Sequence, residues 1–170
     1  SLSVAAGGIT CLLGSNGMGK TTLIRAILGL TPARQGAIVF KGRDITRLPT
    51  HKIVRLGIAS IPEGRKVFPK MSVAENLRLG AFQESSAAVI DGRMQRVFEI
   101  FPRLRERMDQ TAGTMSGGEQ AMVSIGRGLM GEPALLIVDE PSLGLSPLFV
   151  KENFRVINHK NDTGVSLFLV

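Results

Sequence analysis

Four short runs of mostly apolar residues recur along the chain. They cover residues 9–13, 58–61, 134–138 and 165–170. Runs of this length are typical of parallel strands that are covered on both faces, whereas a half-exposed strand alternates apolar and polar residues. The pattern therefore predicts buried parallel strands, and the first of them, residues 9–13, ends at a glycine.

Between these runs, apolar residues recur with the three- to four-residue spacing of helices. The segment 20–30 is apolar in nearly every direction, which predicts a helix that is buried almost all round. A short helix is expected over residues 51–56, with Gly57 as its stop signal. Residues 37–40, followed by Lys41 and Gly42, predict a strand and a tight turn at a small antiparallel edge.

The pattern becomes helical from residue 63 to about residue 132. Ser72 and Glu75 have the spacing of a capping box, which predicts a helix that runs through Leu79. Asp91 is expected to cap a second helix with one apolar face, which we assign to the core. The residues of that face are Met94, Val97, Phe98 and Phe101.

Composition is that of one ordinary globular domain. The chain has 170 residues, of which 44% are hydrophobic and 21% charged. No apolar run is long enough to span a bilayer and no secretory signal opens the sequence, so we expect a soluble cytoplasmic protein. The single cysteine, Cys11, excludes an internal disulfide and is interpreted as a core residue.

The charge and the two ends limit the possible partners. The net charge is +7, but the basic residues are scattered and no Tyr or Trp is present to stack on bases, so we expect no nucleic-acid partner. A solvated basic surface, or one near anionic lipid headgroups, remains open. Because the sequence starts at Ser1 and stops inside an apolar run, we expect a fragment of a longer protein.

The chemistry is concentrated first in residues 14–21, which match the phosphate-binding pattern G-x-x-x-x-G-K-[ST]. Glycines let backbone N–H groups surround phosphates, the lysine reaches the terminal phosphates, and the hydroxyl ligates Mg²⁺. The flanking strand and helix favour this interpretation over a glycine-rich surface turn, because free amides at the helix start face the anion. The candidate nucleotide-binding residues are Gly14, Ser15, Asn16, Gly17, Met18, Gly19, Lys20, Thr21 and Thr22.

A second candidate begins at Ser116, where Gly117 and Gly118 stand at the expected start of a helix. Each glycine costs the helix roughly 1 kcal/mol relative to alanine. One interpretation is a second phosphate site, with Ser116 as N-cap, Glu119 as the reciprocal residue and bare glycine amides close to an anion. A capped helix with permissive glycines explains Ser116 and Glu119 equally well, so the residues alone leave both open.

A third candidate is the pair Asp139 and Glu140, which follows the apolar run 134–138 directly. Ligands of α/β proteins bind at the carboxyl ends of parallel strands. There the first carboxylate would reach the Mg²⁺ shell and the second would orient an attacking water. An acidic turn is the alternative, which the buried strand before it disfavours.

The order of these three motifs resembles the nucleotide-binding subunits of ATP-binding-cassette (ABC) proteins. The similarity covers essentially the whole chain and is greatest to the importer ATPases for branched-chain amino acids. The segments that carry it are GIASIPEGR at 57–65, VFPKMSVAEN at 67–76 and DEPSLGLSP at 139–147. The urea-importer ATPases look similar over the same segments, so a urea importer is one alternative and a soluble ABC ATPase without a transport role is another.

The resemblance implies an α/β fold with a P-loop NTPase (RecA-like) core. This core has a parallel sheet, a small antiparallel edge and an inserted helical subdomain. The implied parts are the first part of the core at 1–62, the helical subdomain with the signature motif at 63–132 and the second part of the core at 133–170. The adenine-stacking aromatic and the switch residue of the family would lie outside 1–170. Gly128 stands where the family usually has alanine, which implies a weaker helix or a closer neighbour.

By the same resemblance, ATP and Mg²⁺ are the cofactors, and the site residues take defined roles. Lys20 binds the β- and γ-phosphates, and Thr21 and Asp139 hold Mg²⁺. Glu140 is the catalytic carboxylate, and Glu63 replaces the glutamine that links Mg²⁺ and water to the membrane partner. The signature segment serves the ATP of a second subunit in trans, and its residues are Ser116, Gly117, Gly118 and Glu119.

The implied partners follow from this arrangement. A homologous or identical ATPase subunit completes a dimer, and transmembrane permease subunits insert a coupling helix near Phe68, Pro69 and Met71. A periplasmic or extracellular solute-binding protein is an indirect partner. The expected place is the cytoplasmic face of a prokaryotic membrane, and the expected activity is ATP hydrolysis that powers uptake of branched-chain amino acids.

Overall fold

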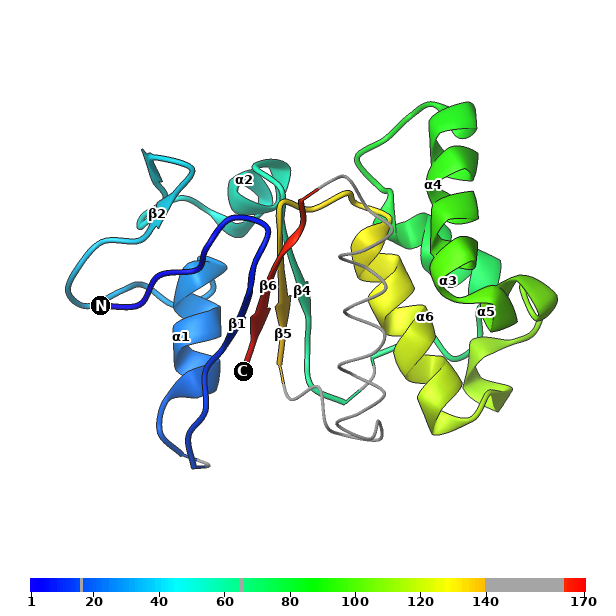
Figure 1. Cartoon of the computed structure of the whole chain (residues 1–170), viewed down its shortest axis with the longest axis horizontal. Helices are drawn as coiled ribbons and strands as arrows, with labels where there is room; N and C mark the ends of the chain where they lie inside the picture. Colours follow the sequence, from blue (N-terminus) through cyan, green and yellow to red (C-terminus); the bar gives the residue numbers. More distant parts are fainter. Residues whose placement is uncertain (16, 65, 140–163) are drawn as a thin grey trace.

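A computed structural model describes residues 1–15, 17–64, 66–139 and 164–170 of the chain (Figure 1). In this part of the chain, no helix is long and apolar enough to cross a membrane. The elements in chain order are β1 (Ile9–Cys11), α1 (Lys20–Ile27), β2 (Val39–Phe40), β3 (Arg43–Asp44), α2 (Thr50–Arg55), β4 (Ile58–Ile61), α3 (Val73–Gly80), α4 (Ala87–Ile100), α5 (Pro102–Glu106), the 3₁₀ helix η1 (Ala112–Thr114), α6 (Gly117–Leu129), β5 (Leu135–Val138) and β6 (Ser166–Leu169).

The main sheet has four parallel strands in the order β1-β6-β5-β4, which confirms the predicted α/β fold with a parallel sheet. Strand β6 lies between β1 and β5, with Phe168 opposite both Thr10 and Ile137. Because the strands are parallel, their carboxyl ends meet at one edge, the lower edge in Figure 1. That edge is where ligands of such sheets bind.

The predicted antiparallel edge is also confirmed. Strands β2 and β3 pair with Phe40 opposite Arg43, which leaves Lys41 and Gly42 as a two-residue turn. Both turn residues have positive φ, 48° and 76°. Positive φ at both central positions is typical of the type I′ turn, whose twist matches that of the flanking strands.

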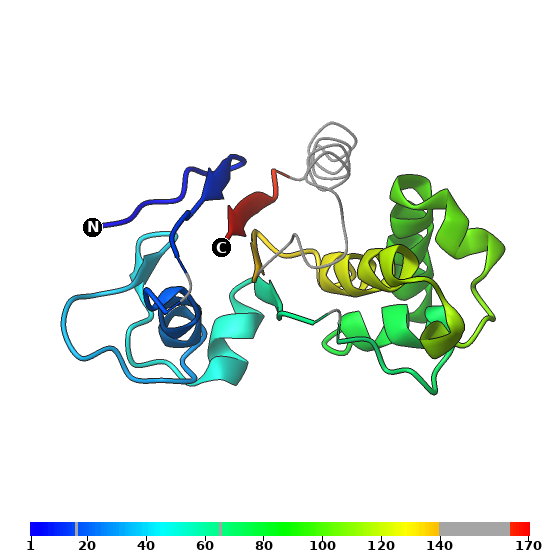
Figure 2. The same cartoon turned by 90° about the horizontal axis from the view of Figure 1, so that it is seen from below.

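Two hydrophobic cores cover opposite faces of the main sheet, and successive residues of β5 belong to different cores. Leu136 and Val138 pack with α3, α4 and α6, whereas Leu135 and Ile137 pack with α1 and α2. All four β5 residues are buried, as predicted, because helices lie on both sides. Figure 2 shows α1 on one side of the sheet and α6 on the other.

The prediction that residues 9–13 form a buried strand is wrong. Strand β1 spans only Ile9–Cys11 and pairs with β6 alone in the described sheet. Ile9 is 44% exposed, and Cys11 is exposed rather than a core residue. Strand β1 is an edge strand here, and an edge strand has no neighbour on one side to cover it.

Helix α1 is buried on one face only, which also corrects the prediction. Ile24 and Leu28 are buried against the sheet core, whereas Leu30 is 56% exposed. Leu23 and Ile27 are partly buried against the same core, and Leu30 lies beyond the end of the helix at Ile27. Apolar residues can stand on any face of a helix, but only the faces that pack against other elements are buried.

Of the two helix caps predicted in the helical region, one is confirmed and the other is wrong. The Glu75 N–H donates to Ser72 Oγ (3.1 Å) and the Ser72 N–H donates to Glu75 Oε2 (2.7 Å), so the predicted capping box opens α3. Helix α4 is capped by Ser86 instead of Asp91, which lies inside the helix. Ser86 also carries a capping oxygen and stands just before the first helical residue, so α4 begins more than one turn before Asp91.

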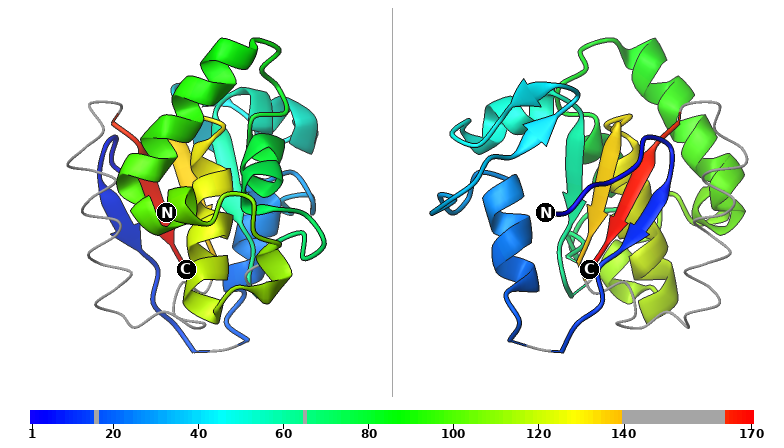
Figure 3. Two further views of the ribbon diagram at one scale, coloured as in Figure 1. Left: turned by 90° about the vertical axis from the view of Figure 1, so that its right-hand side faces the viewer. Right: turned by 60° about the vertical axis from the view of Figure 1, so that its left-hand side comes forward.

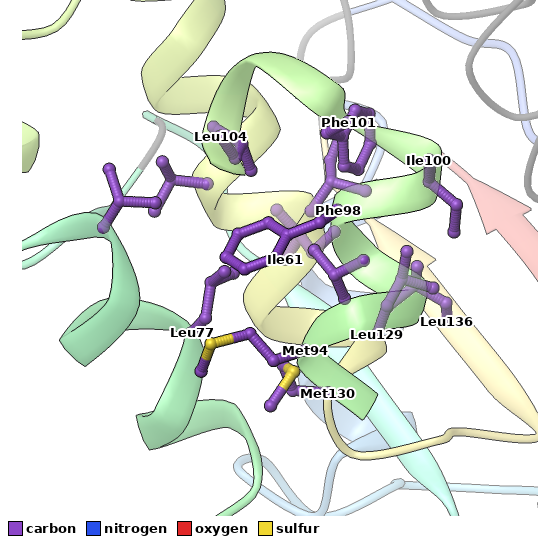
Figure 4. Close-up of a cluster of buried hydrophobic side chains, with 14 of the residues drawn as sticks. Ile61, Leu77, Met94, Phe98, Ile100, Phe101, Leu104, Leu129, Met130 and Leu136 are labelled. Atoms are coloured by element: carbon purple, nitrogen blue, oxygen red, sulfur yellow. The ribbon is translucent and has the colours of Figure 1, made fainter. Parts of the chain in front are cut away.

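Helices α3, α4 and α6 approach one another closely around a core that contains the predicted apolar face of α4 (Figure 4). Met94, Val97 and Phe98 are all at most 5% exposed. A Cβ atom at Gly80 would lie 1.9 Å from the Arg127 carbonyl oxygen, and one at Gly128 would lie 3.1 Å from Leu136 Cδ1. Gly80 thus permits close packing of α3 on α6, whereas Gly128 lets α6 lie close to side chains of β4 and β5, which accounts for the glycine at position 128.

Candidate active site

The loop between β1 and α1 depends on glycine for its backbone conformation. Gly17 and Gly19 have φ of 86° and 83°, in the left-handed region that other residues rarely adopt. A Cβ at either position would meet no atom within 4 Å among the described residues, so the requirement is conformational rather than steric. Asn16 lies outside the described residues.

Lys20 is the first residue of α1, and its side chain folds back onto the loop that precedes the helix. Its Nζ donates hydrogen bonds to the carbonyl oxygens of Gly14 (2.6 Å) and Ser15 (3.1 Å). Gly19, the N-cap, has no side chain to cap the free N–H groups of the first turn, where Thr21 and Thr22 are exposed. Free amides at a helix start, beside a cation, form a site suited to phosphate groups.

Two carboxylates stand at the carboxyl ends of β4 and β5, which are neighbouring strands. Ile61 pairs with Val138 at the ends of these strands, and the Asp139 N–H donates to the Ile61 carbonyl oxygen (3.0 Å). Asp139 is 9% exposed, whereas Glu63, two residues beyond β4, is exposed. Glu140 lies outside the described residues.

The described residues contain no group of three His, Cys, Asp or Glu side chains that would hold a metal unaided. Mg²⁺ does not require one, because it usually keeps its waters and binds one or two carboxylates together with substrate phosphates. A hydroxyl at Thr21 and a carboxylate at Asp139 are oxygen ligands of the kind that Mg²⁺ prefers. The residues present therefore fit the ion.

The N-terminus of α6 has the predicted capping box. Ser116 Oγ accepts from the Glu119 N–H (3.4 Å), and Glu119 Oε2 accepts from the Ser116 N–H (3.0 Å) and hydroxyl (2.8 Å). Arg107 Nη1 lies 3.4 Å from Glu119 Oε1. These bonds explain Ser116 and Glu119, while Gly117 and Gly118 remain half-exposed at the helix start.

Hydrogen bonds from the Ser116 hydroxyl and backbone lower the pKa of Glu119 from its ordinary value of 4.5, and Arg107 and Arg103 lower it further. A depressed pKa means that Glu119 contributes stability above pH 4.5 and loses it as the pH falls through its pKa in the folded protein. We therefore expect Glu119→Gln to lower the free energy of unfolding at neutral pH, and this loss to shrink below pH 4.5.

Urea unfolding of both proteins from pH 7 to pH 3 measures this difference. Ser116→Ala serves as the matched variant, because it removes the largest cause of the shift while it keeps the carboxylate. A stability difference between the wild type and Glu119→Gln that stays constant over this pH range would contradict the assignment.

The loop before α1 and the N-terminus of α6 lie at the same edge of the sheet but apart from each other. The loop before α1, the end of β5 and the N-terminus of α6 all lie toward the lower edge in Figure 1. Helices α1 and α6 pack on opposite faces, so the sheet stands between them, as the two side views show (Figure 3). Among the described residues, Gly14, Ser15 and the segment 17–22 follow the carboxyl end of β1, and residues 116–118 lie apart from them.

A groove of about 680 Å³ lies between β4, α3 and α6, and apart from Phe68 the residues that shape it were not predicted from the sequence. Asn76 is completely buried and its side chain bonds the Phe68 N–H (2.8 Å) and the carbonyl oxygens of Phe68 (3.0 Å) and Ser72 (2.9 Å). An amide on the apolar face of α3, beside Val73 and Leu77, was the available signal. The predicted groove residue Phe68 does line this groove.

The chain is similar to known proteins over its full length. The family model described as ABC transporter matches residues 1–143. The high-affinity branched-chain amino acid transport ATP-binding protein BraG of Pseudomonas aeruginosa is 46% identical over 170 residues, which are 100% of this chain and 72% of that protein. The probable branched-chain amino acid transport ATP-binding protein LivF of Archaeoglobus fulgidus is 37% identical over 95% of this chain and 69% of its own length.

Solved structures agree with the sequence comparisons. An ATP-binding cassette of an ABC transporter, MJ1267 in its ADP conformation, superposes with a TM-score of 0.85 at 27% identity. The superposition covers 99% of this chain and 71% of that one. The family match, the relatives and the shared architecture lead to one conclusion: this chain belongs to the ABC transporter family.

Proposed function

We propose that this protein is the ATP-hydrolysing subunit of an ABC importer for branched-chain amino acids. The observation that carries the proposal is that the glycine loop before α1 and the carboxylate after β5 both lie at the carboxyl edge of the parallel sheet. The ATP-binding subunits of this family are ATPases, and both BraG and LivF are named for branched-chain amino acid transport. The structural relative MJ1267 is described in an ADP conformation, which supports a nucleotide ligand for this protein.

We assign the site residues the following roles. The first-turn amides of α1 bind the phosphates, and Lys20 Nζ, which already donates to the loop carbonyls, has a further N–H to direct at them. Thr21, Asp139 and Glu63 would hold Mg²⁺, which would supply positive charge against the phosphates. Glu140 accepts a proton from the attacking water. In this proposal, the N-terminus of α1 binds the nucleotide, and a carboxylate after β5 activates the water that hydrolyses it.

A dimer completes the site in this proposal. Ser116, Gly117 and Gly118 lie across the sheet from the phosphate loop of their own chain, so they serve the ATP of a second subunit. The half-exposed glycines are available for that contact. Glu119 keeps Ser116 in place through the capping box.

The remaining partners are transmembrane permease subunits and, through them, a solute-binding protein. Phe68 lines the groove and is 49% exposed, which suits contact with a helix of the permease. Pro69 and Met71 were predicted to lie near the same helix. We place the protein at the cytoplasmic face of a prokaryotic membrane. We divide the domain into core segments 1–62 and 133–170 and a helical subdomain 63–132.

Uptake into proteoliposomes tests the proposed function. Vesicles that contain the protein with its transmembrane subunits and solute-binding protein should accumulate labelled leucine when they enclose Mg-ATP. Lys20→Ala should abolish uptake, because it removes the phosphate-binding cation. Labelled urea is the control solute; accumulation of urea without leucine would overturn the proposed substrate.

A further inference from the structure

The excess positive charge of the chain is concentrated in one segment. Of the 21 Lys and Arg and the 14 Asp and Glu of the chain, residues 20–57 contain eight basic residues and a single acidic one, Asp44. This segment therefore carries the whole net charge of +7, while basic and acidic residues balance in the rest of the chain. Such an asymmetry indicates a surface with an anionic partner.

Residues 20–57 fold into one lobe on one face of the main sheet. Ile24 of α1, Ile45 after β3 and Ile53 of α2 are buried in the same core, against residues of β4, β5 and β6. The end of α1 packs tightly on the segment before α2, since a Cβ at Gly29 would lie 2.6 Å from the Leu48 carbonyl oxygen. Figure 2 shows this lobe on the side of the sheet away from α3–α6. The charge excess therefore belongs to one side of the molecule.

Five basic side chains of this lobe stand on the β2–β3 hairpin, on α2 and on the segment between them, and we call them the basic surface. They are Lys41, Arg43, Arg47, Lys52 and Arg55. All five are exposed, and none forms a salt bridge with another described residue. Asp44 is the one carboxylate among them, and it accepts hydrogen bonds from the Thr46 N–H (2.8 Å) and hydroxyl (2.6 Å). The basic surface thus keeps most of its charge free for a partner.

The hairpin turn and the end of α2 lie close to each other. Lys41 of the turn and Arg55 of α2 line one depression of about 300 Å³. Its two carboxylates, Glu84 and Glu132, pair with Arg93 at 3.4 Å and 3.1 Å. They are therefore already balanced by a cation of the helical region and do not cancel the charge of Lys41 and Arg55.

The basic surface borders the groove that we assign to the permease. Thr50 and Val54 of α2 line that groove, and Lys52 and Arg55 stand on the same helix. A permease helix in the groove would bring this side of the lobe toward the bilayer. Val39 of β2, beside the hairpin turn, is 63% exposed. Cations on long side chains next to an exposed apolar residue suit the headgroup layer of a membrane.

Anionic lipid fits these residues better than nucleic acid does. The chain has no Tyr or Trp to stack on bases. The five cations are exposed and have no fixed partners, so they suit a diffuse layer of headgroups rather than one phosphate at a defined position.

We infer that the basic surface binds anionic phospholipid headgroups directly, beside the permease. This inference rests on the proposed function, because it takes the groove next to α2 to be occupied by a permease subunit. Each Lys or Arg near an anionic surface raises the partition onto it about fivefold. The contact orients the subunit with its groove toward the membrane. Salt weakens it, because the screening length falls from about 10 Å at 0.1 M to about 3 Å at 1 M.

Co-sedimentation of the full-length protein with vesicles tests the inference without the permease. Vesicles of phosphatidylglycerol and phosphatidylcholine in equal parts should bind the wild type at low salt, whereas vesicles of phosphatidylcholine alone should not. Arg47→Gln combined with Lys52→Gln should lower the partition about twentyfold, because two cations are lost. Both side chains are exposed and form no salt bridge with a described residue, so this variant should melt close to the wild-type temperature and bind ATP normally.

Arg103→Gln combined with Arg105→Gln is the matched control. It removes the same charge from α5, which packs in the core on the other face of the sheet. This variant should partition like the wild type. An equal loss in the two double variants would show that net charge alone drives binding, and it would overturn the inference.

Three further outcomes separate the inference from its alternatives. Equal binding of the wild type to both kinds of vesicle would overturn it. Duplex DNA that binds the wild type more tightly than the vesicles do, through the same Arg47 and Lys52, would assign the surface to nucleic acid and also overturn it. Leucine uptake by the wild type in proteoliposomes, without any binding to phosphatidylglycerol vesicles, would leave the proposed function intact and reject only the lipid contact.

Discussion

Replacement of Glu140 by glutamine is expected to lower ATP turnover about a hundredfold or more while ATP binding persists. Glutamine keeps the size of the side chain but does not accept the proton of the attacking water. Lys20 and the amides of the α1 N-terminus remain available for the phosphates. ATP bound between two subunits would then persist, and the dimer would accumulate.

Light scattering in the presence of Mg-ATP measures the dimer, and phosphate release measures turnover. Glu106→Gln is the matched control, since the same change at the exposed end of α5 should alter neither quantity. If Glu140→Gln stays monomeric with ATP, the role of Ser116 in trans is wrong. If it hydrolyses ATP at the wild-type rate, the proton acceptor is another group.

The largest expected effect on stability is that of Gly80→Ala. The added Cβ would lie 1.9 Å from the Arg127 carbonyl oxygen and 2.9 Å from Met130 Cβ, and backbone atoms do not yield as a side chain does. Helices α3 and α6 must separate, which we expect to cost about 3 kcal/mol. Urea unfolding, followed by circular dichroism, gives the loss as a lower midpoint.

Gly92→Ala, in the same helical region, is expected to raise the stability instead of lowering it. Gly92 lies inside α4, and a Cβ there would meet no atom within 4 Å among the described residues. Alanine should stabilise this helix by about 0.5–1 kcal/mol. Equal midpoints for Gly80→Ala and the wild type would show that α3 and α6 are not packed as closely as described.

The Gly80 contact also bears on function. It joins α6, which is capped by Ser116, to α3, whose end lines the groove. Separation of α3 from α6 should therefore weaken permease binding as well as folding.

Much of the fold was predictable because its signals are local. The capping boxes at Ser72 and Ser116 each involve residues three positions apart, so the spacing in the chain is already the spacing in space. The turn at Lys41 and Gly42 depends on two adjacent dihedral preferences. The order of the three motifs carried the family assignment for the same reason, because each motif is a short contiguous segment.

The wrong predictions concern which residues are buried and which of two residues caps a helix. The edge position of β1 depends on strand β6, more than 150 residues later in the chain, where Ile9 pairs with Leu167. Apolar composition does not reveal which faces a neighbour covers. Ser86 and Asp91 are both able to cap α4, and the start of the helix decided between them.

Residue types and local spacing were thus sufficient for most of the elements and for the family, and they supplied the candidate phosphate-binding residues. Packing between distant segments decided which strand lies at the edge, why Gly80 and Gly128 lack side chains, and where Arg127 is held. Arg127 meets Lys66, 61 positions away, because α6 packs beside β4 and α3. Such a contact depends on the mutual placement of whole helices and strands, to which no local pattern in the sequence corresponds.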